Sequence, residues 1–180
     1  KKTTNVDCRS YSFISADTGW IMALRPVKYY FKKENDVFRL MLKLKFIHDK
    51  ELNIGDTASE WSRSISSTWS KEGLKVEANI VEGDDPSYIN IEVQPWPSSF
   101  YLKRVSSHQW SLLTPYSVID HEAGHLLGLN DEYFEPNKNL SSNNRGRLMG
   151  EPDSIMRNML YGTPQKRHIQ FILSSLKCFK

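Results

Sequence analysis

Two histidines and a glutamate have the types and the spacing of a metal site. In His121-Glu122-Ala123-Gly124-His125 the two imidazoles are four residues apart. On a helix they lie one turn apart on the same side, so both can reach a single zinc ion (Zn2+). Glu122 neighbours both histidines, where its carboxylate can take a proton from a zinc-activated water. The segment therefore predicts a helix that carries two zinc ligands, called here the zinc helix, and a general base.

The residues after the zinc helix offer a third ligand. Gly128 is placed to end the helix, because glycine adopts the left-handed conformation that turns the chain back. Asp131 then needs only the short turn at 129–130 to reach the metal, which leaves a fourth position open for water. The rival ligand is His168, a better zinc donor that would have to come from a distant helix. A plainer alternative is that Asp131 only caps the turn while Glu132 faces solvent.

These residues resemble a known family. The pattern His-Glu-x-x-His-x-x-Gly-x-x-Asp, followed by Glu132-Tyr133, is similar to the metzincin zinc peptidases. It is most similar to the snapalysin-like branch, in which aspartate replaces the usual third histidine. Metzincins also have a methionine turn beneath the zinc, and residues 153–158, with Met156, resemble one. Some metzincins place a tyrosine two residues after the methionine as an extra ligand, but this chain has Asn158 there.

The resemblance implies a zinc-dependent endopeptidase with Glu122 as the general base and Met156 packed beneath the metal. Tyr133, Tyr161 and His168 are candidates to stabilise the oxyanion. The substrate would be a peptide or protein, with the peptides of peptidoglycan as another option. A secreted bacterial toxin or effector also fits the resemblance.

A second hypothesis is a non-catalytic zinc-containing binding module derived from a peptidase. It requires a closed site with four protein ligands, the fourth supplied by His168 or Glu132. The presence of Glu122 argues against it, because a structural site has no use for a carboxylate beside the first ligand.

Length and charge exclude several classes of protein. At 180 residues we expect one domain, 1–180, with an N-terminal lobe over about 1–129 and a C-terminal lobe over about 130–180. The net charge is +3 with no long basic run, so we expect no nucleic-acid partner. No apolar stretch is long enough for a membrane span. The chain opens without an apolar signal segment, which suggests a mature chain or an excised domain.

Cys8 and Cys178 lie near opposite ends of the chain. Two free thiols are one interpretation. Because domain termini often lie close together, we favour a Cys8–Cys178 disulfide and hence a secreted or periplasmic location.

Hydrophobic patterning predicts the elements that hold the site. Residues 20–31 suggest a strand, in which Pro26 indicates an edge position or a bend. This strand is expected to form a hairpin with the alternating strand 37–47. Thr57 and Glu60 match a capping box for a helix over 57–70. The remaining indications are a core stripe of Trp61, Ile65 and Trp69 on that helix, and a second hairpin from strands 74–80 and 89–93.

The C-terminal half has fewer regular patterns. Residues 94–114 and 135–152 are expected to be loops. Thr114-Pro115 and Thr163-Pro164 each look like a cap and first helical residue, opening the zinc helix and a last helix that runs through Lys177. The predicted fold is α+β: a twisted, mainly antiparallel sheet backed by helices, with the zinc helix on the cleft floor and a C-terminal helical lobe.

Overall fold

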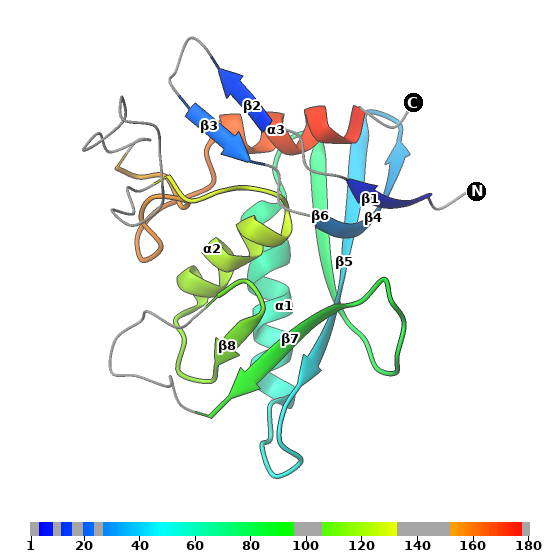
Figure 1. Cartoon of the computed structure of the whole chain (residues 1–180), viewed down its shortest axis with the longest axis vertical. Coiled ribbons are helices and arrows are strands. Elements are labelled where there is room, and N and C mark those ends of the chain that lie inside the picture. Colours follow the sequence, from blue (N-terminus) through cyan, green and yellow to red (C-terminus); the bar gives the residue numbers. More distant parts are fainter. Residues whose placement is uncertain are drawn as a thin grey trace.

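The computed structural model describes residues 4–8, 12–15, 20–23, 27–95, 106–132 and 152–177. Over these residues the fold is α+β, as the sequence predicts, with eight strands and three helices. Six strands form one curled sheet and the other two form a separate antiparallel pair (Figure 1). The division into two lobes stays a prediction.

Five strands come before the first helix, three strands follow it, and two helices end the described chain. The strands are β1 (Thr4–Cys8), β2 (Ser12–Ser15), β3 (Trp20–Ala23), β4 (Val27–Glu34), β5 (Val37–Ile47), β6 (Leu74–Ile80), β7 (Ile89–Gln94) and β8 (Gln109–Ser111). The helices are α1 (Gly55–Trp69), α2 (Tyr116–Leu126) and α3 (Lys166–Lys177). The zinc helix is α2.

The large sheet is mixed, and the expectation of a mainly antiparallel sheet is wrong. β1 pairs with β4 and β4 with β5 in antiparallel fashion, whereas β6 and β7 run parallel to β5, and β8 runs parallel to β7. The predicted second hairpin is therefore wrong too. Helix α1 is a crossover connection, which makes β6 parallel to β5. Leu44 of β5 pairs with both Ile80 of β6 and Ile89 of β7. Residues 81–88 therefore connect two strands that each pair with β5 and not with each other.

The first hairpin is confirmed. β4 and β5 pair from Glu34↔Val37 to Tyr30↔Met41, and the turn between them has Asn35 in the left-handed region at φ 55°. The strand predicted over 20–31 is divided in the structure. Its first part is β3, which pairs with β2, and its second part belongs to β4.

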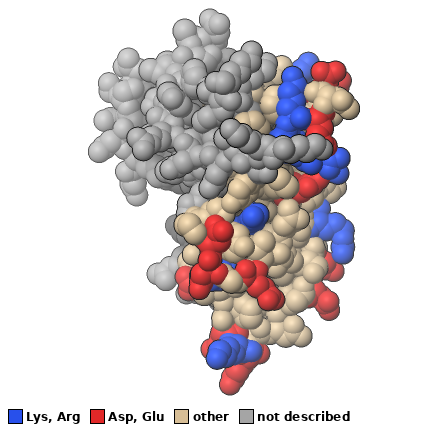
Figure 2. Space-filling view, turned by 90° about the vertical axis from the view of Figure 1, so that its right-hand side faces the viewer, with Lys and Arg blue, Asp and Glu red and all other residues tan. Residues whose placement is uncertain are grey.

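Strand β5 has the predicted bounds and the predicted alternation. Leu40, Leu42 and Leu44 are buried, while Arg39 and Lys45 on the other face form ion pairs with acidic side chains. Because strand residues alternate between faces, one face of β5 lies on the core and the other faces solvent. On the face of the molecule shown in Figure 2, basic and acidic side chains are interspersed.

Helix α1 covers the buried face of the sheet, and its core stripe is confirmed. Trp61, Ile65 and Trp69 are fully buried. The predicted capping box is wrong: the helix begins earlier, at Gly55, and its N-cap is Ile54, without a side-chain hydrogen bond. The early start makes Thr57 and Glu60 helical residues, so the pattern was a coincidence.

Three aromatic rings, from β5, α1 and β8, form one cluster in the core. Trp61 and Trp110 meet edge to face with centroids 5.4 Å apart, and Phe46 lies 5.6 and 5.7 Å from them. Trp110 belongs to β8, a short strand inside the segment 94–114 that was expected to be a loop throughout. Three residues are too few for alternation to be detected from the sequence.

The other two helices start slightly later than predicted. Pro115 is the N-cap of α2 rather than its first residue, and α3 begins at Lys166 rather than at Pro164. Ile169 and Ile172 of α3 are buried, as expected. Within the described part of the chain, no helix combines the length and apolarity needed to cross a membrane.

Candidate metal centre

Helix α2 is enclosed on all sides rather than half exposed. Every residue from Val118 to Leu126 is buried, including His121 and His125. The packing explains the glycine within the helix. A Cβ at Gly124 would lie 2.5 Å from Sδ of Met156 and 2.8 Å from Cζ2 of Trp69. Glycine at this position therefore lets α1 and the methionine turn approach the back of the zinc helix.

The end of α2 has the geometry predicted for Gly128. Gly128 has φ 96°, in the left-handed region. The amide of Leu129 donates to the carbonyl of Gly124 and the amide of Gly128 to that of His125, both at 3.0 Å. These are the two hydrogen bonds of a Schellman motif. The turn sends the chain back along the helix, toward the histidines.

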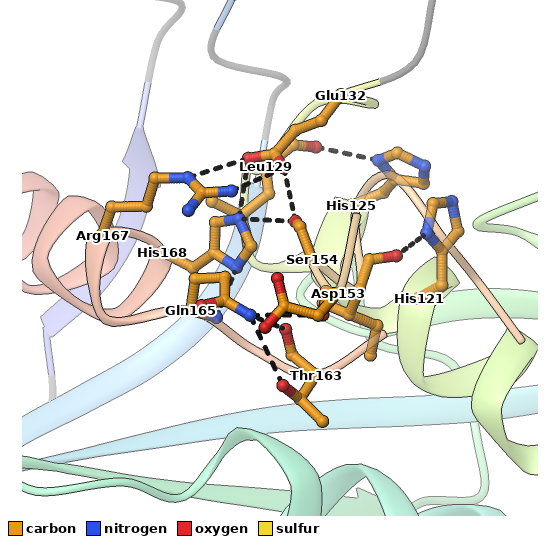
Figure 3. Close-up of polar contacts among 11 residues, drawn as sticks. His121, His125, Leu129, Glu132, Asp153, Ser154, Thr163, Gln165, Arg167 and His168 are labelled. Carbon is orange, nitrogen blue, oxygen red and sulfur yellow. Dashed lines mark hydrogen bonds and ion pairs between the residues drawn. The ribbon is translucent and has the colours of Figure 1, made fainter. Parts of the chain in front are cut away.

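Both histidines have one ring nitrogen fixed by a backbone carbonyl. Nδ1 of His121 lies 2.7 Å from the carbonyl oxygen of Ile155, and Nδ1 of His125 lies 2.8 Å from that of Leu129 (Figure 3). Since a carbonyl oxygen can only accept, each Nδ1 carries a proton and donates it. The Nε2 lone pair of a neutral ring is then available to a metal, the orientation that such partners impose on zinc-binding histidines.

Asp131 lies where the two Nε2 atoms converge. Its Oδ1 is 3.1 Å from Nε2 of His121 and 3.2 Å from Nε2 of His125. This oxygen is buried and makes no hydrogen bond of good geometry. Ligands of a tetrahedral zinc are separated by about 3.3 Å when each bond is 2.0–2.1 Å long. A cation between these three atoms would fit their spacing and would satisfy the buried oxygen.

The charges of this group also favour a cation. Burial opposes the ionisation of Asp131, but the two imidazoles outweigh it and hold the pKa of its carboxyl far below the ordinary value. Burial likewise lowers the pKa of His121, but Asp131, the Ile155 carbonyl and Glu122 together raise it above the ordinary value. Without a metal, the negative charges around His121 favour the protonated form of that ring, the same preference that would favour a bound cation.

Glu122 lies near His121, His125 and Asp131, but its carboxylate is farther from Nε2 of His125 than that of Asp131. The ligand atoms of His121, Glu122 and His125 all lie within 4.8 Å of one another, so these three buried residues can hold a metal ion. Oε2 of Glu122 is 4.0 Å from Nε2 of His125, farther than Asp131. At this distance Glu122 is better placed to contact a water on the metal than to be a direct ligand.

Residues 153–163, which begin with the predicted methionine turn at 153–158, form a closed loop. The backbone amides of Ile155 and Thr163 donate to the carbonyls of Thr163 and Asp153, at 3.0 and 2.7 Å. Met156 is fully buried and its carbonyl accepts from the amide of Glu132 at 2.8 Å. The loop thus holds both the ring of His121 and the segment after Asp131.

Glu132 and His168 form a buried cluster of their own. Nε2 of His168 lies 2.8 Å from Oε1 of Glu132, and its Nδ1 accepts from the amide of Gln165 at 3.0 Å. Arg167 and Ser154 also bond to the Glu132 carboxylate (Figure 3). Both ring nitrogens of His168 are therefore occupied outside the group of His121, His125 and Asp131. Glu132 is 5% exposed, so the alternative in which it faces solvent is wrong.

The other candidates have separate outcomes. Tyr133 lies outside the described residues. Tyr161 is 83% exposed. Asn158 accepts from the amides of Leu160 and Tyr161 through its side chain, so it shapes the loop in which it lies.

Several site residues carried no signal in the sequence. The carbonyls of Leu129 and Ile155 have no side-chain signature, and Ser154 and Arg167 reach Glu132 from far along the chain. Asp120, next to the first histidine, is a further buried residue: its Oδ2 accepts from Ser64 and Thr68 of α1.

Comparison of the chain with protein-family models, with curated proteins and with solved structures finds no match. The function of the protein is therefore inferred from the geometry of the site and from its sequence pattern.

Proposed function

We propose that the protein is a zinc-dependent endopeptidase. The observation that supports it most strongly is the convergence of Oδ1 of Asp131 on the two Nε2 atoms, at 3.1 and 3.2 Å, while both Nδ1 atoms are fixed by carbonyls. His121, His125 and Asp131 would hold the zinc. Three protein ligands leave one position for water or substrate, as in catalytic rather than structural zinc sites.

Glu122 is the residue that moves the proton. Zinc, when bound, supplies a Lewis acid that polarises the scissile carbonyl and lowers the pKa of a water toward about 7. The buried carboxylate of Glu122 accepts the proton of the attacking water and delivers it to the nitrogen of the leaving amine. A positioned general base typically contributes about 10²–10⁴-fold to the rate. The carbonyls of Ile155 and Leu129 keep the rings of His121 and His125 in place throughout.

The sequence pattern supports assigning this site to a metzincin-type peptidase of the snapalysin-like branch. The position of Met156 beneath α2 and the turn at Gly128 are consistent with that assignment. Five strands, β1 to β5, precede α1, the first long helix, more than the metzincin pattern has there. The substrate class proposed is a peptide or protein, with peptidoglycan peptides as an alternative.

The competing binding module is less well supported. It requires a fourth protein ligand, for which Glu132 and His168 were the candidates. These two side chains hydrogen-bond to each other instead, and Glu132 also accepts from Arg167. Among the described residues, neither candidate is placed to supply a fourth ligand, which supports a site with an open position, as a catalytic zinc requires.

Digestion of a diverse peptide library tests the proposal. The metal is removed with a chelator and then restored as Zn2+. We expect cleavage that disappears on chelation and returns with zinc, and the cleaved sequences will give the side-chain preference. A chain that binds one zinc tightly but cleaves no peptide, including peptidoglycan peptides, would favour the binding module.

A further inference from the structure

The buried cluster of Glu132, Ser154, Arg167 and His168 lies next to the zinc site but contributes no ligand to it. Arg167 holds the Glu132 carboxylate with two contacts, 2.8 Å from Nη2 to Oε2 and 3.3 Å from Nε to Oε1. His168 binds Oε1 at 2.8 Å, and Ser154 donates to Oε2. One carboxylate thus binds two residues of α3 and one of the methionine turn.

This many partners is what a buried carboxylate requires. Glu132, Ser154 and His168 are at most 5% exposed. A charge taken out of water is tolerated when a counter-ion and hydrogen bonds replace the lost solvation. Paired guanidinium and carboxylate groups also fix direction, because two parallel contacts define the plane of the carboxylate. The cluster therefore fixes the position of Glu132, not only its charge.

Glu132 is the next residue in the chain after Asp131, the predicted third ligand. Asp131 points toward the histidines of α2, and the next side chain points toward α3. The amide of Glu132 is held by the Met156 carbonyl at 2.8 Å. With its amide and its carboxylate both fixed, Glu132 restricts the backbone that carries Asp131.

We infer that Glu132, anchored to Arg167 and His168, is a positioning residue that holds Asp131 in place for the metal and couples α3 to zinc affinity. The inference rests on the proposed zinc site. A general structural role for the cluster would change the stability of the protein but not the zinc affinity of the folded state. The ligand itself is unchanged in every variant below, so any change in affinity reports its placement.

Zinc affinity, measured by competition with a chelating dye well below the unfolding temperature, distinguishes these roles. We expect Glu132→Gln and Arg167→Ala to weaken zinc binding by roughly 10–100-fold, the usual effect of losing a residue that orients a ligand. Arg167→Lys, which keeps the positive charge, should recover part of the loss. If Glu132→Gln fails to fold, the two Arg167 variants decide the question, since Arg167 is partly exposed.

Arg39→Ala is the matched control. Arg39 is 35% exposed against 31% for Arg167, and it pairs with Glu34 and Glu77 on the sheet. It should bind zinc as the wild type does. Variants at Glu132 and Arg167 with a lower melting temperature but wild-type zinc affinity would overturn the inference. Wild-type protein that binds no zinc would instead overturn the proposed function, and the inference with it.

Discussion

Each histidine of α2 is oriented by a backbone carbonyl. The carbonyls of Ile155 and Leu129 belong to the methionine turn and to the turn after Gly128. Their positions depend on the course of the chain, not on side chains that a mutation can remove. The proposed zinc site would thus be preorganised by two loops, and residues that shape those loops should affect zinc binding as well as the fold.

Gly124→Ala should destabilise the protein, although alanine normally favours a helix over glycine by about 1 kcal/mol. The new methyl group would lie 2.5 Å from Sδ of Met156 and 2.8 Å from the Trp69 ring. Overpacking of this kind costs about 1–3 kcal/mol. Denaturant unfolding measures it, with Gly55→Ala of α1 as control because a methyl group has room there. Equal stabilisation by both substitutions would contradict this packing.

Asp131→Ala should weaken zinc binding by at least about 100-fold, because it removes a ligand and not merely a residue that orients one. His168→Ala removes a partner of Glu132 and should have a smaller effect. Metal titration of both variants compares them directly. Loss of zinc from the His168 variant, with retention by the Asp131 variant, would reverse the assignment of the third ligand.

At the scale of elements, Trp69 joins α1 to the site. Its indole Nε1 donates to the carbonyl of Asp120 at 2.8 Å, and its ring packs against Gly124 and 6.3 Å from His168. One side chain of α1 thereby contacts both α2 and α3. This contact helps to hold α2 against α1.

Trp69→Phe should cost about 2–3 kcal/mol in unfolding free energy, from lost packing and a lost buried hydrogen bond. Trp61→Phe is the matched control on the same helix, because Trp61 is equally buried but its Nε1 has no hydrogen-bond partner among the described residues. Its substitution should cost about 1 kcal/mol less. Thermal unfolding of both variants decides, and equal costs would show that the Trp69 hydrogen bond contributes nothing.

Elements that bury one face were predictable from the sequence. Apolar residues recur at every second position in β5 and about once per turn in α1, so the spacing of hydrophobic residues predicted both elements. Strand pairing did not follow, because β6 and β7 alternate in the same way whether they pair with each other or with β5. The capping box predicted at Thr57 was wrong because α1 begins two residues earlier, at Gly55, so that Thr57 lies inside the helix. A local pattern does not by itself determine where a helix begins.

In the site, too, local geometry was predictable from the sequence and long-range contacts were not. His121, His125, Gly128 and Asp131 are close in sequence, and a helix followed by a left-handed turn brings them together by local geometry. The cluster around Glu132 depends on α3, 36 residues away, and no local pattern specifies that contact.

At the scale of the whole molecule, the predicted Cys8–Cys178 disulfide remains to be tested. Cys178 and the side chain of Cys8 lie outside the described residues. A bond between them would close most of the chain into one loop and stabilise it by roughly 4 kcal/mol in the chain-entropy model. Reduction should then lower the melting temperature. Intact mass with and without alkylation gives the answer directly: two alkylatable thiols in unreduced, unfolded protein would remove the argument for a secreted or periplasmic protein.

The central claim is that the site is catalytic and that Glu122 is its base. Zinc content and peptide cleavage measured side by side on wild type and Glu122→Ala test it most directly. We expect equal zinc binding, with turnover in the variant lower by about 10²–10⁴-fold or more, because the substitution removes the base and none of the three proposed ligands. Loss of zinc from Glu122→Ala would show that Glu122 is a ligand, and zinc bound by both proteins with cleavage by neither would contradict the enzyme.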